Sequence, residues 1–542
     1  LTKTLRVSIN RNTILFIIDI VFVFYTIIDQ IEDEFIHIQA IFLLERKHAL
    51  VVEQESERAH SSEVATKLIK DAANVADGTC SVIRQRIYKD SNAMWSIALI
   101  GHWFVIALVF TGRILYCALD IILGHVLALR IGYDGAKRRV VFRFRTSRFN
   151  SYGYLFSDLC KSFAPDAFAV NYTLAKNPEI SSQEFESVKT IGAALEKHGM
   201  DVTYEFCNLP TAFKASVVKV DNPQGRLAIL CEYDALPEVG HACGHSASGA
   251  MSILAALTLR KMQQDGVAFN MDIDIIGTPD EEAMGCKVDM CNAGVFKDYD
   301  FAIMVHLDGE ETRPNSQFLA LDCFRAKFHG KPAHAAGEPW NGVNAVNGVQ
   351  LAIHAMDMMR QQVRPETRIG TWIIAGGTAS NVIPPYGELE VTVRHTERDY
   401  LNGLSEQIKK IFEGAALCTG TTVDVEFYGN PYDDMNQNHR GTALIEDVMA
   451  DMGLDFEPGP AALGGSSDIG NVSYQCAAFH PKLRLAGDDK VCHSKEFAAA
   501  MLEPSIEQTI IDGANIIGGT LLRLVENPTI LNEIVAEFNS TK

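Results

Sequence analysis

The fold is indicated first by Arg226-Leu-Ala-Ile-Leu-Cys-Glu-Tyr-Asp-Ala-Leu-Pro237, which has the pattern of a short buried strand that ends in two carboxylates. It is followed by His241-Ala-Cys-Gly-His-Ser246 and then by residues 246–264, whose Ala, Leu and Met predict a helix. Helix and strand patterns continue to alternate from about Tyr154 onward. This alternation predicts an α/β fold.

Possible metal ligands follow two further apolar stretches, residues 271–277 and 301–305, which also predict strands. Open α/β sheets bind ligands at the carboxyl ends of their strands, so we expect side chains at these ends to converge. A histidine far downstream must join them if the last part of the chain returns to the same domain. The candidate ligands are Cys243, His245, Glu282, His306 and His493, with Glu281 next to them.

Sulfur, imidazole and carboxylate together are the ligand mixture that zinc-like ions prefer. Each group alone has an ordinary structural explanation, since buried cysteines are usually inert, core histidines are hydrogen-bonded and most acidic pairs are solvated. Their joint occurrence at predicted strand ends favours a metal site. A second carboxylate beside a ligand carboxylate is what metal-assisted hydrolysis needs as its base, so the pattern indicates a hydrolase.

Length and composition narrow the remaining classes. The 542 residues exceed one ordinary core, and the 47% hydrophobic content is that of a globular protein. Residues 1–150 contain 19 Lys and Arg against 15 Asp and Glu, a net charge of +4. The net charge of the whole chain is −20, so residues 151–542 carry a net charge of −24. An acidic body argues against nucleic-acid binding. The twelve cysteines lack a regular spacing, which favours reduced thiols and a cytoplasmic body.

The first 150 residues are a different kind of sequence. Residues 94–112 form an apolar run in which His102 is the only ionisable side chain, and this length nearly matches a bilayer. Residues 14–28 and 114–129 are weaker candidates, and buried soluble helices would explain all three. We expect an N-terminal extension over 1–150 with apolar helices, a possible membrane anchor of undefined orientation.

The rest of the chain divides into three predicted parts. Residues 151–317 and 433–542 form the two parts of a catalytic domain, and residues 318–432 form an inserted unit. The insertion has a β-α-β-β-α-β order, which is the split ferredoxin-like pattern. Its predicted elements are strands over 318–328, 368–375, 388–394 and 422–428 and helices over 341–363 and 397–417.

Ordered motifs over residues 155–525 make the chain similar to the amidohydrolase branch of the M-twenty metallopeptidase family, which includes aminoacylases, hippurate hydrolase and p-aminobenzoyl-glutamate hydrolase. The Glu-Tyr-Asp-Ala-Leu-Pro and Gly-Asn-Val-Ser signatures resemble its β-alanyl-lysine-type dipeptidases most. The resemblance implies a zinc-exopeptidase-like catalytic domain with an inserted lid and dimerisation domain. The motifs are Leu209-Pro-Thr-Ala-Phe213, Glu232 to Pro237, Gly240 to His245, Gly277 to Glu282, Gly330-Lys-Pro-Ala-His-Ala335, Gly376-Gly-Thr-Ala-Ser-Asn-Val-Ile-Pro384 and Gly465 to Ser473.

The resemblance also implies roles for single residues. Cys243, His245, Glu282, His306 and His493 match the ligands of two divalent ions, with Zn favoured because of the cysteine and Mn possible. Glu281 matches the general base, and Asp234 matches an acidic residue that orients a ligand. His334 matches a residue that stabilises the oxyanion, often across a homodimer, and Asn381 and Arg394 match residues that hold the substrate's carboxylate. Two positions depart from the pattern: Ser246 replaces a common Asp, and Glu232 stands where another residue is usual.

The sequence thus predicts a metal-dependent amidohydrolase or dipeptidase that cleaves a small dipeptide or N-acyl amino acid, with β-alanyl-basic dipeptides favoured. Hydrolysis of p-aminobenzoyl-glutamate or N-acyl amino acid conjugates is the alternative within the class. Two alternatives of other classes are an inactive binding protein that retains the fold and a membrane receptor with a decayed enzyme domain. For Asp468, two roles are possible, either helix N-cap or site residue.

Overall fold

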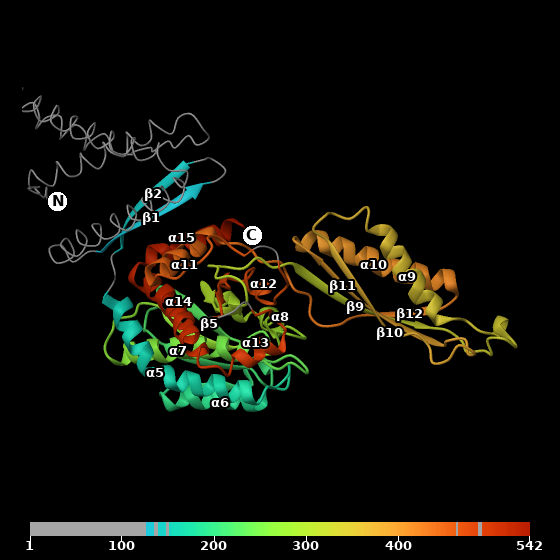
Figure 1. The fold of residues 1–542 in the computed structure, drawn as a ribbon, viewed down its shortest axis with the longest axis horizontal. Helices are drawn as coiled ribbons and strands as arrows, with labels where there is room; N and C mark the ends of the chain where they lie inside the picture. Colours follow the sequence, from blue (N-terminus) through green and yellow to red (C-terminus); the bar gives the residue numbers. More distant parts are fainter. Residues whose placement is uncertain (1–125, 135–138, 148–150, 462–463, 486–489, 542) are drawn as a thin grey trace, which may run out of the picture. The chain divides into compact units, whose positions relative to one another are not determined.

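The computed structural model describes residues 126–134, 139–147, 151–461, 464–485 and 490–541 (Figure 1). The chain separates into two compact units, Leu1–Phe149 and Asn150–Lys542. The predicted boundaries at 317/318 and 432/433 divide the second unit, and they stay predictions.

In the first unit, the described residues form an antiparallel hairpin of β1 (Val126–Asp134) and β2 (Arg139–Ser147). The expectation of apolar helices over residues 1–150 is therefore wrong for this segment. The physical reason is visible in Phe142-Arg-Phe-Arg145, whose alternation of apolar and charged residues has the period of a strand. The candidate spans at 14–28 and 94–112, and most of 114–129, lie outside the described residues. Within the described part of the chain, no helix has both the length and the apolar character needed to cross a bilayer.

The second unit contains a six-stranded sheet in the order β13-β7-β5-β6-β4-β3. Its four strands from β13 to β6 are parallel, whereas β4 and β3 continue the sheet antiparallel. The predicted strand over 226–231 is confirmed, and the other two predicted strands are present but shorter. The strands are β3 (Val202–Tyr204), β4 (Phe213–Val218), β5 (Arg226–Cys231), β6 (Asp272–Gly277), β7 (Phe301–Ile303) and β13 (Ala477–Phe479).

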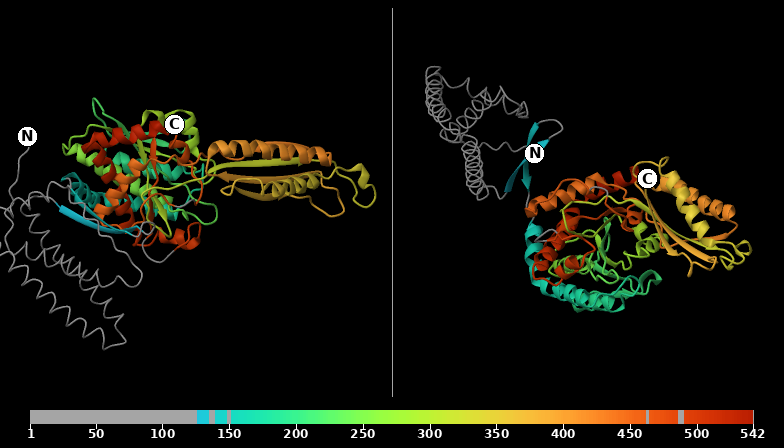
Figure 2. Two further views of the ribbon diagram at one scale, coloured as in Figure 1. Left: turned by 90° about the horizontal axis from the view of Figure 1, so that it is seen from above. Right: turned by 45° about the vertical axis from the view of Figure 1, so that its right-hand side comes forward.

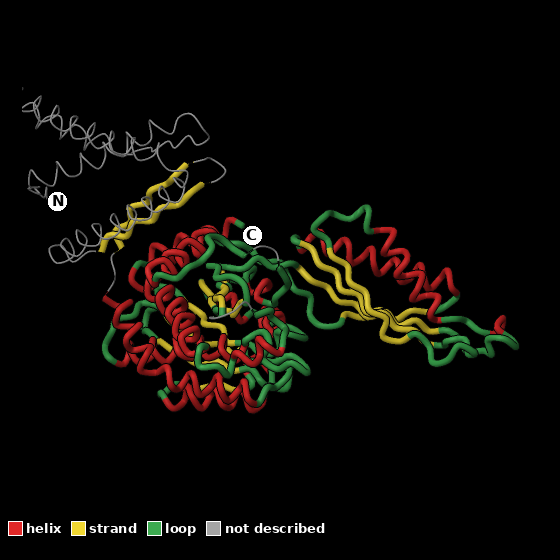
Figure 3. Tube along the Cα trace, viewed as in Figure 1, coloured by secondary structure: helices red, strands yellow, loops and turns green. Residues whose placement is uncertain are grey.

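Helices cover both faces of this sheet, because successive residues of each strand point to opposite sides (Figures 1 and 3). Leu227 and Ile229 of β5 belong to the core that includes α5 (Ser151–Lys176), α7 (His245–Gln264) and α14 (Ile506–Glu526). Ala228 and Leu230 belong to the core on the other side, with residues of α8 (Cys286–Asn292) and α12 (Ile469–Val472). The remaining main helices are α6 (Phe185–Lys197), α11 (His439–Met452), α13 (Lys495–Ala500) and α15 (Pro528–Ser540).

Residues 320–427 form a second sheet unit with its own core (Figure 2). The strands are antiparallel in the order β10-β11-β9-β12, and α9 and α10 pack on one face. Along the chain the elements follow as strand, helix, strand, strand, helix, strand. They are β9 (Ala320–His329), α9 (Ala345–Met359), β10 (Arg368–Ala375), β11 (Tyr386–His395), α10 (Arg398–Thr419) and β12 (Thr422–Phe427).

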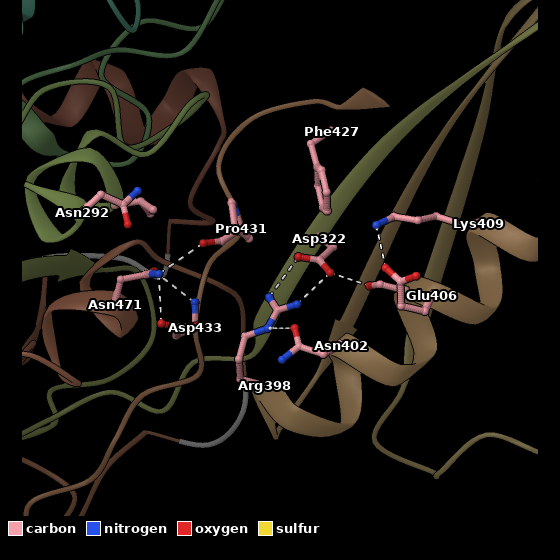
Figure 4. A pocket seen from close by; sticks show the side chains of 12 residues that line it. Asn292, Asp322, Arg398, Asn402, Glu406, Lys409, Phe427, Pro431, Asp433 and Asn471 are labelled. Carbon is pink, nitrogen blue, oxygen red and sulfur yellow. Dashed lines mark hydrogen bonds and ion pairs between the residues drawn. The ribbon is translucent and has the colours of Figure 1, made fainter. Parts of the chain in front are cut away.

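At the base of the second sheet unit, Leu321 of β9 pairs with Tyr432, which lies in the segment after β12. Arg398, the first residue of α10, donates to both carboxylate oxygens of Asp322 at 2.9 and 2.7 Å and to the carbonyl of Tyr432 at 3.2 Å. Arg398 and Asp322 border a cavity of about 490 Å³ between α8, α12 and the second sheet unit (Figure 4). Arg398 therefore links the first turn of α10 both to the start of β9 and to the segment that follows β12.

Candidate metal centre

The carboxyl ends of three neighbouring parallel strands carry the site. Glu232 and Asp234 follow β5, Glu281 follows β6, and His306 follows β7 and begins the short strand β8 (His306–Asp308). Strand β8 pairs in parallel with β14 (Lys482–Arg484), so a strand from the last part of the chain lies beside this edge. The edge is where the sequence placed the ligands.

The helix α7 supplies the next two donors. Gly244 precedes its first residue, His245, in the left-handed conformation with φ of 82°. A side chain at this glycine would also collide with Leu307, at 2.6 Å from the nearest atom, so glycine is required on both counts. The tight turn places Cys243 and His245 one after the other against the strand ends.

The structure brings all five predicted ligands and Glu281 together. Their donor atoms form overlapping sets in which every atom lies within 4.8 Å of the others. Cys243 and His245 are buried, whereas His493 is exposed at the rim. The three sets are Cys243, His245 and His306; Cys243, Glu282 and His493; and His245, Glu281 and Glu282.

These donors fit divalent ions of the zinc type. Two nitrogens bound at roughly 2.0–2.1 Å to one tetrahedral zinc lie about 3.3 Å apart. The Nε2 atoms of His245 and His306 are separated by 3.3 Å. Oxygen Oε1 of Glu282 is buried without a hydrogen-bond partner, and burial of a carboxylate oxygen needs a cation or proton to offset its cost.

Asp234, predicted to orient a ligand, contacts two of the predicted ligands. Its Oδ1 lies 2.9 Å from Nδ1 of His245, and its Oδ2 accepts from the backbone N–H of Glu282 at 2.9 Å. Ser181 donates to the same Oδ2 at 2.8 Å. Burial opposes both charges, but the attraction between Asp234 and His245 raises the pKa of the imidazole well above its ordinary value and lowers that of the carboxyl. Because Nδ1 faces Asp234, Nε2 is directed at the centre.

Glu281, next to the predicted ligand Glu282, lies among other carboxylates. Burial, followed by the charges of Glu232 and Glu282, raises the pKa of the Glu281 carboxyl well above its ordinary value. Its backbone carbonyl accepts from the Tyr432 hydroxyl at 2.9 Å, which attaches the residue to the segment that leaves the second sheet unit. A carboxylate with this raised proton affinity is suited to accept a proton from water.

His493 reaches the centre through an unusual backbone conformation. Its φ is 65°, in the left-handed region that non-glycine residues seldom occupy, and its N–H donates to the carbonyl of Ala242 at 2.9 Å. Its Nε2 is 2.8 Å from Sγ of Cys243. Backbone strain of this kind is tolerated where surrounding contacts fix it, and it often marks functional positions.

Sequence reasoning missed two residues beside the centre. Lys287 of α8 is fully buried, with Nζ 2.6 Å from Glu232 and 2.6 Å from Asp468. Asp468 precedes α12 but caps none of its N–H groups, and its carboxylate lies instead with those of Glu232 and Glu281. His480 stacks on His306 with ring centroids 5.1 Å apart and lies 3.1 Å from Ser316. No pattern marked Lys287 or His480, because a single lysine in a helix or histidine after a strand is common.

The three predicted residues of the second sheet unit lie in two places. Arg394, near the end of β11, donates to Ser466 at 3.3 Å, two residues from Asp468. His334 and Asn381 are exposed and adjacent, with the N–H of Ala335 donating to the carbonyl of Asn381 at 3.0 Å. His334 follows the end of β9 and Asn381 precedes the start of β11, and these two strand ends are paired through His329 and Tyr386.

The length of β9 separates these two places. The rings of Phe318, just before β9, and His480 have their centroids 5.0 Å apart. Because His480 stacks on His306, β9 starts beside the centre. Ten residues at about 3.3 Å each give β9 a length of about 30 Å. In Figure 1, the strands of the second sheet unit extend away from the six-stranded sheet. Within one chain, therefore, Arg394 is near the centre, whereas His334 and Asn381 are not.

Comparisons with known proteins agree with this architecture. The model of peptidase family M20/M25/M40 matches residues 228–520. A mouse Xaa-Arg dipeptidase is 32% identical over 338 residues, which cover 61% of this chain and 78% of that protein. A p-aminobenzoyl-glutamate hydrolase component from Escherichia coli (strain K12) is 32% identical over 272 residues, or 46% and 55% of the two chains. The structure of an aminobenzoyl-glutamate utilization protein from Klebsiella pneumoniae covers 66% of this chain and 97% of its own, with a TM-score of 0.52 and 18% identity, which shows a shared fold.

Proposed function

The chain belongs to peptidase family M20/M25/M40 and is a metal-dependent hydrolase of amide or peptide bonds, and from this premise we propose that it is a dipeptidase for dipeptides with a basic C-terminal residue. The observation that carries the proposal is the convergence of thiol, imidazole and carboxylate donors on one sheet edge. The name of the mouse relative, which specifies an Xaa-Arg dipeptide, supports the substrate class.

The proposed ligands are the five residues whose donors converge. Two divalent ions held there, zinc by preference because of the thiolate, would supply a polarised carbonyl and a water of lowered pKa. Asp234 keeps His245 in the orientation that presents Nε2 to the centre. Cys243, His245, Glu282, His306 and His493 form this proposed set.

Glu281 is the proposed general base. Its carboxylate lies next to the ligands His245 and Glu282, and burial favours its protonated form once it has accepted a proton. The same group then delivers this proton to the leaving amine, so that the amide nitrogen departs neutral. The inactive binding protein is not favoured, because the base and every proposed ligand are present.

We assign substrate positioning to the second sheet unit, acting as a lid. Arg394 faces the catalytic body and is suited to pair with the free carboxylate of the substrate. His334 and Asn381 lie too far from the centre of their own chain, which supports a homodimer in which they serve the partner's site. Cleavage of p-aminobenzoyl-glutamate is the alternative substrate class, supported by the name of the bacterial relative. A cytoplasmic location of the catalytic body stays a prediction.

The variant Glu281→Gln tests the proposal directly. It keeps the shape of the side chain and removes the proton acceptor, so turnover should fall by about 10²–10⁴ while the bound metal is unchanged. The measurements are metal content and hydrolysis of a panel of β-alanyl, arginyl and aminobenzoyl-glutamyl amides. Glu310→Gln, at an exposed carboxylate after β8, is the matched control and should keep native turnover. Native turnover by metal-loaded Glu281→Gln would contradict the assignment.

A further inference from the structure

A buried lysine lies inside an acidic cluster that adjoins the centre. Oxygens of Glu232, Glu281 and Asp468 lie within 4.8 Å of one another, which is the arrangement of a possible third cation site. Nζ of Lys287 is 2.6 Å from Oε1 of Glu232 and 2.6 Å from Oδ1 of Asp468. The backbone N–H of Lys287 also donates to Oδ2 of Asp468 at 3.0 Å.

Three members of the cluster are closed to solvent, whereas Glu281 is partly exposed and adjoins the centre. The side chains of Lys287, Glu232 and Asp468 are all within 1% of complete burial, so these charges depend on one another rather than on water. The other oxygen of Glu232, Oε2, has no hydrogen-bond partner and lies 3.4 Å from Nε2 of His245. Glu281 belongs both to this cluster and to the set with His245 and Glu282. Without a resident cation, the cluster would compete with the centre for ions.

We infer that the ammonium of Lys287 is a built-in cation that occupies this third position, and that it prevents a further divalent ion from binding Glu281. Lys287 is thus a positioning residue, because a base coordinated to a metal could not accept a proton from water. The inference rests on the proposed function, since it takes Glu281 as the base. A lysine suits the task because its ammonium is a compact charge that carries three donors and cannot be lost to chelators or dialysis.

The variant Lys287→Met tests the inference in the full-length chain. It keeps an unbranched side chain one atom shorter and removes the charge, leaving the acidic cluster open. After equilibrium dialysis against Zn²⁺ or Mn²⁺, it should bind one more ion per chain than the native protein. Its turnover should fall at least a hundredfold as this extra ion loads, which is the lower limit for loss of a general base. Lys482→Met is the matched control, because Lys482 pairs with Asp308 at 2.8 Å next to the ligand strand but outside the cluster.

Two further variants keep the test decisive. Lys287→Met/Glu232→Gln removes one charge of each sign and should bind the native number of ions. If Lys287→Met does not fold, the metal content of Glu232→Gln is measured instead. The inference assigns Glu232 to the ammonium of Lys287, so Glu232→Gln should bind as many ions as the native protein. A folded Lys287→Met with native stoichiometry, an extra ion in Lys482→Met as well, or loss of an ion in Glu232→Gln would overturn it. A native chain that binds no divalent ion would instead refute the proposed function.

Discussion

The metal centre and the second sheet unit differ in how much of a site one chain can build. At the centre, the ends of β5, β6 and β7 and the start of α7 place their donors in overlapping sets of three whose atoms lie within 4.8 Å of one another. In the second sheet unit, Arg394 lies at one end of β11, whereas His334 and Asn381 lie beyond the other. Parallel strands gather their carboxyl ends at one edge, but long antiparallel strands separate the residues at their two ends. A single chain therefore completes the proposed ligand set and leaves the proposed substrate contacts divided.

The largest effect expected from this difference concerns His334. If it stabilises the oxyanion, His334→Ala should lower turnover about 10²–10³-fold and leave metal content unchanged. The comparison predicts that this histidine acts on the partner's centre. Mixed dimers of His334→Ala and Glu281→Gln chains should then regain activity, because one of their two sites contains both native residues. Co-expression of the two differently tagged variants and assay of the doubly purified dimer measures this.

The complementation result separates the two geometries. Ala336 and Gly337 donate backbone N–H groups to Nδ1 of His334, so the ring is held in place whether or not a partner is present. Dimers of each single variant with itself serve as controls. A mixed dimer as inactive as its parents would show that His334 serves its own chain after a large movement, and the contrast between the two regions would fail.

Substitution of Asp234 is expected to have a smaller effect, on metal affinity, and it tests how the centre itself is built. Asp234→Asn keeps the shape but removes the charge that pairs with His245 and one of the two acceptors. Loss of such a partner lowers metal affinity about 10–100-fold. Competition with a chromophoric chelator measures this affinity. Ser181→Ala removes only the hydroxyl that donates to Asp234 and should change the affinity much less. Equal losses in both variants would contradict a specific role for the charge.

The sequence predicted the centre better than its surroundings, for a physical reason. Strand ends such as Gly277 and turns such as Cys243-Gly-His245 fix ligands through local backbone geometry, which short patterns report. The buried Lys287 depends on two carboxylates 55 and 181 residues away, and no local pattern carries that information. The hairpin of β1 and β2 depends on the pairing of two segments, which the apolar content of residues 114–129 does not report.

The same limit applies to the second sheet unit. Its β10 matches the predicted bounds, Arg368–Ala375, because strand and helix periods are local properties. The separation of Arg394 from Asn381 follows from the length and pairing of β11, which become apparent only once the sheet is assembled. A family resemblance assigns both residues to one carboxylate, but it does not state which chain provides each.

The smallest effect on turnover is expected where the two regions join. Arg398→Met removes the paired contacts with Asp322, and hydrogen bonds to charged groups contribute about 1.5–3 kcal/mol each to the free energy of unfolding. Chemical denaturation should show this loss, with a smaller one for Arg398→Lys, which keeps the charge but not the two-pronged geometry. Turnover at saturating substrate should stay within a few-fold of native, because Arg398 contacts no proposed ligand. A loss of turnover as large as that of His334→Ala would mean that the chain's own connection, rather than the partner, brings the second sheet unit to the centre.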